Sequence, residues 1–178
     1  MKYTNLPNTD KKVSKICLGT MTWGEQNTEA EGHEQIELAL DKGVNFLDTA
    51  EMYPVPARPE TQGRTEEIIG TWLKKTKRRD EIVLNSKIAG PGEQVAHIRD
   101  NLDYSKEALE DALDKSLKRL QTDAIDIYQL HWPERQTNFF GILSLSFNEA
   151  EDCVENFEEV ISNLHACVNK GKIKPIAR

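Results

Sequence analysis

The stretch Val44-Asn45-Phe46-Leu47-Asp48 decides the fold class of this chain, because a short apolar run ends there in a carboxylate directly after a helix-length segment. Residues 29–42 carry apolar side chains at helical spacing, and Gly43 is a typical residue just past a helix C-terminus. The run at 44–48 is short and bounded, which is typical of a buried strand. A helix that leads at once into a buried strand is the unit from which α/β proteins are built.

The same alternation continues along the rest of the sequence. We expect strands at 15–20, 44–48, 81–86 and 124–130, and helices at 29–42, 64–77, 105–120 and 151–170. The segment before the first strand could form a short hairpin, and 172–177 resembles the start of a fifth strand. Repeated strand–helix units predict a parallel sheet with helices packed over it. Two architectures fit this pattern, an open doubly wound sheet and a (β/α)8 barrel.

Two features favour the barrel. The segment Gly19-Thr20-Met21-Thr22-Trp23-Gly24, which follows the first strand, is not the Gly-x-Gly-x-x-Gly fingerprint of dinucleotide-binding open sheets. Long loops at about 53–63 and 131–149 both follow strands, and long functional loops at strand C-termini are typical of barrels. We therefore expect one α/β domain over residues 1–178, and the open sheet remains the less favoured alternative.

Composition argues against several classes of function. The net charge of −7 does not suit a general nucleic-acid surface, which needs a basic face. No run approaches the ~18 apolar residues of a membrane span, and the N-terminus lacks the apolar core of a signal peptide. We therefore expect a cytosolic, cytoplasmic protein that binds no membrane. Cys17, Cys153 and Cys167 are widely spaced and suggest neither a disulfide framework nor a metal site.

Three of the expected strands lead into polar side chains suited to proton transfer. Asp48 ends one strand, with Tyr53 five positions further on, and Lys87 and His131 directly follow two others. If these strands belong to one parallel barrel, their C-terminal ends meet at one mouth. We therefore expect the four side chains to converge there and to form an active site.

The chemistry of this set centres on Tyr53. A free phenol has a pKa near ~10, and a nearby ammonium such as that of Lys87 would lower it. Asp48 could keep Lys87 charged and oriented, while His131 could orient a substrate oxygen. Tyr53 would then donate a proton to a carbonyl oxygen as a hydride reaches the carbon, and a cofactor would have to supply that hydride. Taken singly, each residue is more often a turn cap, a surface lysine or a packed loop residue.

Several segments resemble the aldo-keto reductase family along essentially the whole chain. They are residues 18–24, 45–53, 86–87, 116–123 and 126–133. Residues 51–56 and 58–63 resemble the bacterial NADP(H)-dependent branch that is related to potassium-channel β subunits. The resemblance implies a (β/α)8 TIM barrel with an N-terminal hairpin at its base, and an oxidoreductase that reduces aldehydes or ketones with NADPH (NADP).

The resemblance also implies roles for individual residues. The catalytic set of the family falls on Asp48, Tyr53, Lys87 and His131, with Tyr53 as the proton donor. Contacts to the nicotinamide side of the cofactor fall on Thr20, Met21 and Gln26, together with Asp48. The implied partner is a small-molecule carbonyl substrate. The alternative function is a non-catalytic regulatory or binding module of the channel β-subunit type.

The chain departs from the family in its length. A (β/α)8 barrel takes about 250 residues, and this chain supplies about four β/α units and the hairpin. The family continues with a Gly-x-Ser-Asn turn, where residues 171–178 have a different sequence with Pro175 in the expected strand. We expect a partial barrel, arising by truncation, as a fragment or as one piece of a two-chain barrel. Its open edges could lead to oligomers or aggregates, and we expect little activity from the chain alone.

Overall fold

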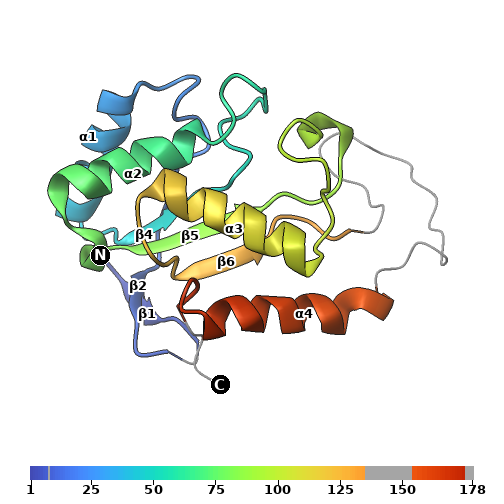
Figure 1. Cartoon of the computed structure of the whole chain (residues 1–178). Helices are drawn as coiled ribbons and strands as arrows, with labels where there is room; N and C mark the ends of the chain where they lie inside the picture. The colour runs from blue at the N-terminus through green and yellow to red at the C-terminus, as the bar shows by residue number, and fades with distance from the viewer. Residues whose placement is uncertain (8, 135–153, 175–178) are drawn as a thin grey trace, which may run out of the picture.

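The computed structural model describes residues 1–7, 9–134 and 154–174 (Figure 1). Its main sheet contains four parallel strands that lie side by side in chain order. They are β3 (Cys17–Gly19), β4 (Phe46–Asp48), β5 (Val83–Ile88) and β6 (Ile127–Leu130). The helices that follow them are α1 (Glu29–Asp41), α2 (Arg64–Thr76), α3 (Lys106–Leu120) and α4 (Val154–Asn169). The predicted strand–helix alternation and the parallel sheet are confirmed.

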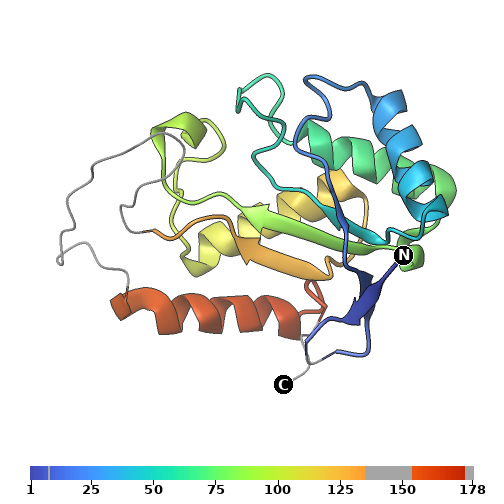
Figure 2. The same ribbon diagram turned by 180° about the vertical axis from the view of Figure 1, so that it is seen from behind.

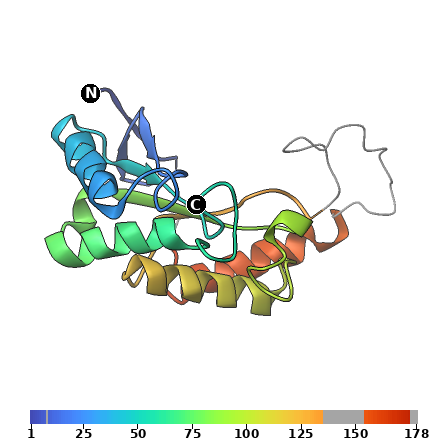
Figure 3. The same ribbon diagram turned by 90° about the horizontal axis from the view of Figure 1, so that it is seen from above.

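The helices form one layer over one face of this sheet. In Figure 1, α2 and α3 lie in front of the strands, α1 lies at the upper left and α4 lies below β6. Figure 3 shows α2 and α3 together on one side of β5. Seen from behind in Figure 2, β5 and β6 lie in front of α2 and α3. Within residues 1–7, 9–134 and 154–174, no helix covers this second face of the sheet. We call it the open face, and it corresponds to the interior of a barrel.

The main core lies between the helix layer and the sheet. It joins strand residues to buried side chains of α1, α2 and α3, among them Leu47, Leu84, Ile125, Ile36, Ile68, Trp72 and Leu113. Burying each such side chain stabilises the fold by roughly 1.5–3 kcal/mol. At Gly70 of α2, an added Cβ would lie 2.1 Å from the backbone oxygen of Arg119 in α3. The absence of a side chain at Gly70 is therefore what lets these two helices approach so closely.

The predicted hairpin is present at the N-terminal ends of the parallel strands. Strands β1 (Tyr3–Asn5) and β2 (Lys12–Ser14) pair antiparallel. The Ser14 N–H donates to Asn45 Oδ1 at 2.8 Å, and Asn45 Nδ2 donates to the Lys12 carbonyl at 2.9 Å. Asn45 directly precedes β4, so the hairpin covers the base of the sheet and leaves the C-terminal strand ends accessible.

A buried carboxylate holds several segments together at this base. Asp126 is fully buried and accepts from Lys11 Nζ and Arg79 Nη2, each at 2.7 Å, and from the Leu84 N–H at 2.9 Å. Lys174 Nζ lies 3.2 Å from the same carboxylate. Burial opposes the charged form, but the Leu84 hydrogen bond and the Lys11 and Arg79 cations outweigh it and hold the pKa of Asp126 at about 2.

All four parallel strands begin two or three residues later than the sequence predicts. Strand β5 starts later than predicted because Arg79–Glu81 form a short 3-10 helix, η1, and it continues to Ile88, so that Lys87 lies inside the strand. The expected fifth strand is represented by one parallel bridge between Ile125 and Ile173. Pro175, most of the predicted long loop at 131–149 and the first residues of the predicted helix at 151–170 lie outside the described residues.

Candidate active site

The strand register places two of the predicted catalytic residues on the open face. Asn85 and Lys87 of β5 point to the same side, because successive side chains of a strand alternate between faces. Asp48 of β4 lies opposite Asn85, and Gln129 of β6 lies opposite Lys87. Four polar side chains from three neighbouring strands therefore meet near the C-terminal edge of the sheet.

Asp48 and Lys87 form an ion pair at the centre of this group. Lys87 Nζ lies 2.7 Å from Asp48 Oδ2 and donates to the Thr49 carbonyl at 2.8 Å. Asn85 Nδ2 donates to the other carboxylate oxygen of Asp48 and to Gln129 Oε1. The ammonium is therefore held in one position by two acceptors, and its carboxylate partner is itself fixed from the other side.

Tyr53 and His131 complete the group. Lys87 Nζ lies 5.0 Å from the centroid of the Tyr53 ring. The rings of Tyr53 and His131 meet edge to face, with their centroids 5.7 Å apart and an interplanar angle of 78°. The Gly63 N–H donates to the Tyr53 carbonyl at 2.9 Å, and the His131 N–H donates to the Ile88 carbonyl at 3.0 Å. The structure thus brings together all four residues that the sequence singled out for catalysis.

The pKa of Tyr53 is shifted in the opposite direction to the one inferred from sequence. Burial, reinforced by the nearby Asp48 carboxylate, raises the pKa of Tyr53 to about 12. We expected Lys87 to lower it, but the Lys87 ammonium is bonded to Asp48 and to the Thr49 carbonyl. Tyr53 is therefore a neutral phenol at pH 7, which is the form that a proton donor requires.

His131 is also neutral at pH 7. Burial and the Lys87 ammonium lower its pKa to about 4, and the Asp48 carboxylate opposes them only in part. Its Nδ1 atom is buried and has no hydrogen-bond partner among the described residues. A neutral imidazole can donate one N–H to a substrate oxygen without adding a charge to the site.

The residues predicted to contact a cofactor lie in the loop after β3. Thr20 is fully buried, and its hydroxyl donates to the Asp48 carbonyl at 2.8 Å. Met21 is 46% exposed, and its carbonyl accepts from the Val55 N–H at 3.0 Å, close to Tyr53 in the chain. Gln26 has an exposed side chain further along this loop. Thr20 and Met21 thus adjoin the catalytic group, whereas Gln26 lies further from it in the chain.

Sequence reasoning did not single out Asn85, which holds both Asp48 and Gln129. Its Oδ1 atom is buried and has no hydrogen-bond partner among the described residues. The signal in the sequence is an amide within an otherwise apolar strand, because a buried polar group in such a run must find a partner. Sequence reasoning also missed Glu51 and Arg99, a buried ion pair just outside the four residues.

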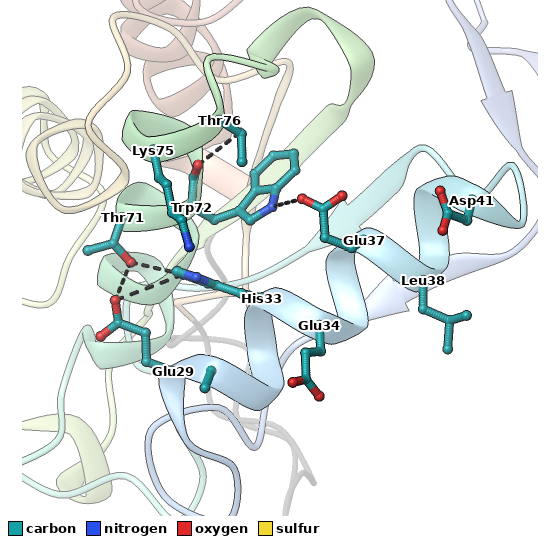
Figure 4. Close-up of a pocket in the computed structure, with 11 residues that line it drawn as sticks. Glu29, His33, Glu34, Glu37, Leu38, Asp41, Thr71, Trp72, Lys75 and Thr76 are labelled. Carbon is teal, nitrogen blue, oxygen red and sulfur yellow. Dashed lines mark hydrogen bonds and ion pairs between the residues drawn. The ribbon is translucent and has the colours of Figure 1, made fainter.

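A separate groove lies on the outer surface between α1 and α2 (Figure 4). Its polar groups bond to one another across the two helices. Thr71 Oγ1 donates to Glu29 Oε1 at 2.6 Å, and Trp72 Nε1 donates to Glu37 Oε1 at 2.7 Å. These bonds explain how α1 is held on α2, and the groove contains none of the four candidate catalytic residues.

Residues 15–177 match the Aldo/keto reductase family. The chain belongs to the aldo-keto reductase family. The resemblance inferred from the sequence is thereby confirmed, and so is a fold of the aldo-keto reductase type. The aldo-keto reductases are oxidoreductases that generally use nicotinamide cofactors.

Individual aldo-keto reductase relatives share most of this chain. Protein tas of Escherichia coli (strain K12) is 44% identical over 177 residues, which are 99% of this chain and 51% of that protein. The probable voltage-gated potassium channel subunit beta of Arabidopsis thaliana is 33% identical over 141 residues, 77% of this chain and 39% of that protein. The holo form of AKR11C1 from Bacillus halodurans matches with a TM-score of 0.70 and 30% identity, covering 98% of this chain and 48% of that one. The chain spans about half the length of the relatives that it matches.

Among the described residues, no three His, Cys, Asp or Glu side chains gather as they would around a metal ion. In the same part of the chain, no helix is both long enough and apolar enough to cross a membrane.

Proposed function

We propose that this chain carries the proton-transfer half of an NADPH-dependent carbonyl reductase site, in which Tyr53 protonates the oxygen of an aldehyde or ketone. The observation that carries the proposal is the convergence of a neutral phenol, a fixed ammonium and a neutral imidazole at one edge of the sheet. These three groups can supply a proton, stabilise the charge left behind and orient the carbonyl oxygen.

Lys87 acts on the charge that develops when Tyr53 gives up its proton. A phenol with a pKa of about 12 is a reluctant acid, so its conjugate base must be stabilised as it forms. The Lys87 ammonium beside the Tyr53 ring provides a fixed positive charge for this purpose. Because Asp48 and the Thr49 carbonyl already hold the ammonium in place, it needs little reorganisation during the reaction.

His131 orients the substrate. Its neutral ring, edge-on to Tyr53, can donate a hydrogen bond to the same oxygen that Tyr53 protonates. A charged imidazolium would instead compete with Tyr53 as the acid, and the lowered pKa of His131 prevents this at neutral pH. The two groups therefore divide the work into proton donation and positioning.

The residues present fit one end of a nicotinamide dinucleotide. The buried Asn85 Oδ1 atom has no partner within the part of the chain that the structure describes and can accept from an amide, and the exposed Met21 side chain offers an apolar contact for a ring. We keep Asp48, Thr20 and Gln26 as predicted contacts of the same ligand. NADPH, when bound, supplies the hydride that a side chain cannot supply.

The test uses the chain alone and a chimera that joins residues 1–178 to the part of E. coli Protein tas beyond the matched region. NADPH oxidation is followed with 4-nitrobenzaldehyde as substrate. We expect turnover by the chimera and little or none by the chain alone. Tyr53→Phe should lower the activity of the chimera by about 100-fold or more, which is typical for loss of a general acid.

The matched control is Tyr3→Phe in the hairpin at the base of the sheet, which removes a hydroxyl bonded to the Gly43 carbonyl. It should leave turnover unchanged. An inactive chimera, or one in which Tyr53→Phe is as active as Tyr3→Phe, would rule the reductase proposal out.

The similarity to a probable channel β subunit keeps a second candidate function, a non-catalytic regulatory or binding module. For such a module, Tyr53→Phe should leave binding of a partner protein intact while the chimera shows no turnover. Isolation of a stoichiometric partner protein under those conditions would favour the module over the reductase.

A further inference from the structure

A buried ion pair lies just outside the four catalytic candidates. Glu51 is 1% exposed, and the Arg99 side chain is 6% exposed. Arg99 Nη1 donates to Glu51 Oε1 at 2.5 Å, and the same oxygen accepts from the Ala89 N–H at 2.5 Å. The other terminal nitrogen of Arg99, Nη2, donates to the Ala89 carbonyl at 2.6 Å. We call Glu51 and Arg99 together the Glu51–Arg99 clamp.

The stability of the fold does not by itself explain why this ion pair is buried here. Two buried charges cost desolvation energy that their attraction repays only when the geometry is good, and an apolar pair of similar size is often as stable or more so. Burial raises the pKa of Glu51, and the Arg99 charge and the Ala89 N–H oppose that rise. Glu51 and Arg99 form three hydrogen bonds with each other and with the backbone of Ala89. Such an arrangement is better explained by a need to hold the neighbouring segments in one position.

Those neighbours are the segments that carry Tyr53 and Lys87. Glu51 lies two residues before Tyr53, and its own N–H donates to the Lys87 carbonyl at 3.1 Å. Its side chain holds Ala89, two residues beyond Lys87. Glu51 therefore contacts the end of β5 on both sides of Ile88. Gln62 Nε2 also donates to the Glu51 carbonyl at 2.6 Å.

The loop that ends at Arg99 also contacts the segment that follows β6. The loop from Ala89 to Arg99 contains the short 3-10 helix η2 (Glu93–Val95). The Pro91 carbonyl in this loop accepts from Trp132 Nε1 at 2.9 Å. Val95, Ala89 and Trp132 share one buried apolar cluster with Tyr53. Because Trp132 follows His131 directly, the clamp links all the loops that carry catalytic candidates.

We propose that the Glu51–Arg99 clamp sets the position of Tyr53 relative to Lys87, which makes Glu51 and Arg99 positioning residues for proton transfer. The proposal rests on the proposed function of these groups, and neither clamp residue touches the substrate. Without the clamp the Ala89 N–H loses its partner, and the loop that carries Tyr53 is free to move away from the Lys87 ammonium.

Three variants test the clamp. Glu51→Gln keeps the shape and one acceptor but removes the charge, and Arg99→Met removes the cation. The double variant Glu51→Met/Arg99→Met replaces the pair by apolar side chains and should keep most of the stability. The control is Glu66→Gln, which breaks another buried pair, with Arg119 and Ser86, on the helix side of the sheet.

The first measurement is the titration of His131 by NMR in the 178-residue chain, assigned with His131→Asn. Its pKa of about 4 depends on burial and on the Lys87 charge. We expect it to move toward 6.5 in all three clamp variants, including the stable double variant. We expect it to stay at about 4 in Glu66→Gln, although that variant unfolds more easily.

The second measurement is the kinetics of the chimera. The clamp variants should lower kcat at least tenfold with little change in KM, whereas Glu66→Gln should lower neither. If the chimera is inactive, the reductase proposal fails and the titration still tests the clamp. A clamp variant that keeps the His131 pKa at about 4, or a control that moves it equally, would overturn the clamp.

Discussion

The ammonium nitrogen of Lys87 lies 5.0 Å from the centroid of the Tyr53 ring. This contact joins a strand residue to a loop residue of the preceding β/α unit, and it places a fixed cation beside the ring that would become a phenolate. The same cation lowers the pKa of His131, the other ring at this edge. Lys87 thus acts on both groups that would handle the substrate oxygen.

Replacing Lys87 by methionine should therefore have two effects. In the chimera, kcat should fall by about 100-fold, because the phenolate of Tyr53 loses its counter-charge. In the chain itself, the pKa of His131 should rise, since a nearby positive charge is gone. NADPH oxidation and histidine NMR measure the two effects. Lys115→Met, which removes an exposed lysine paired with Asp111, is the control and should change neither.

His131 should make the stability of the chain depend on mildly acidic pH. Its pKa is about 4 in the fold and 6.5 as the reference value, so the unfolded state binds its proton first. The stability from the neutral imidazole is complete above pH 6.5 and is lost as the pH falls from 6.5 to 4, by up to about 3 kcal/mol. Urea unfolding across this range should show the loss, and His131→Asn should flatten it. An equally steep profile in His131→Asn would contradict the assignment.

Asp126 should stabilise the lower end of the sheet, next to the hairpin, down to a pH of about 4. Asp126→Asn leaves Lys11, Arg79 and Lys174 around a neutral amide, and it should lower the free energy of unfolding by about 3 kcal/mol. The stability that its low pKa adds is complete above pH 3.8 and is lost as the pH falls toward 2. Chemical unfolding at pH 7 measures the loss. Asp111→Asn, in an exposed pair, should cost less than about 1 kcal/mol, and equal losses would refute this role.

Gly70→Ala should separate α2 from α3. The new Cβ would lie 2.1 Å from the Arg119 carbonyl oxygen, a clash that outweighs the gain of about 1 kcal/mol in helix propensity. We expect a net loss of at least 2 kcal/mol in thermal or chemical unfolding, by analogy with an overpacked core. Gly19→Ala, where an added Cβ meets nothing within 4 Å, is the control. A Gly70→Ala protein as stable as wild type would show that the helices can slide apart at little cost.

The flanks of the sheet should make the chain alone prone to association. Ile16 beside β3 is 60% exposed, and Phe157 and Ile161 on α4 are 55% and 37% exposed. Exposed apolar side chains next to a strand edge favour self-association. We expect oligomers or aggregates of the chain in sedimentation and strong binding of a hydrophobic dye. The chimera should reduce both signals, and a monodisperse monomer of the chain alone would refute the prediction.

Much of the fold follows from local patterns. Apolar spacing and Gly43 predict α1 and β4 to within two residues, because a helix end and a buried run are encoded by neighbouring residues. The start of β5 is also two residues later than predicted, since Glu81 belongs to a short 3-10 helix that its sequence does not distinguish from an extended segment. Lys87 was placed just after the strand, and it lies within it.

The candidate site was predictable only in part. The common position of Asp48, Lys87 and His131 at strand ends indicates that they converge, and the family resemblance supplies their roles. The bonds from Asn85 to Asp48 and from Arg99 to Glu51 join residues 37 and 48 positions apart. Such long-range pairings depend on strand register and loop path, which local periodicity does not encode. For the same reason, the raised pKa of Tyr53 could not be anticipated.

The buried carboxylate of Asp126 lies at the base of the sheet, whereas the loops with Tyr53 and Arg99 lie beyond the opposite strand ends. Changes in those loops therefore leave the ion pairs of Asp126 untouched. The loops and the base are thus separate in what they contribute to the molecule. Sequence changes in the loops should alter thermal tolerance less than changes around Asp126 do.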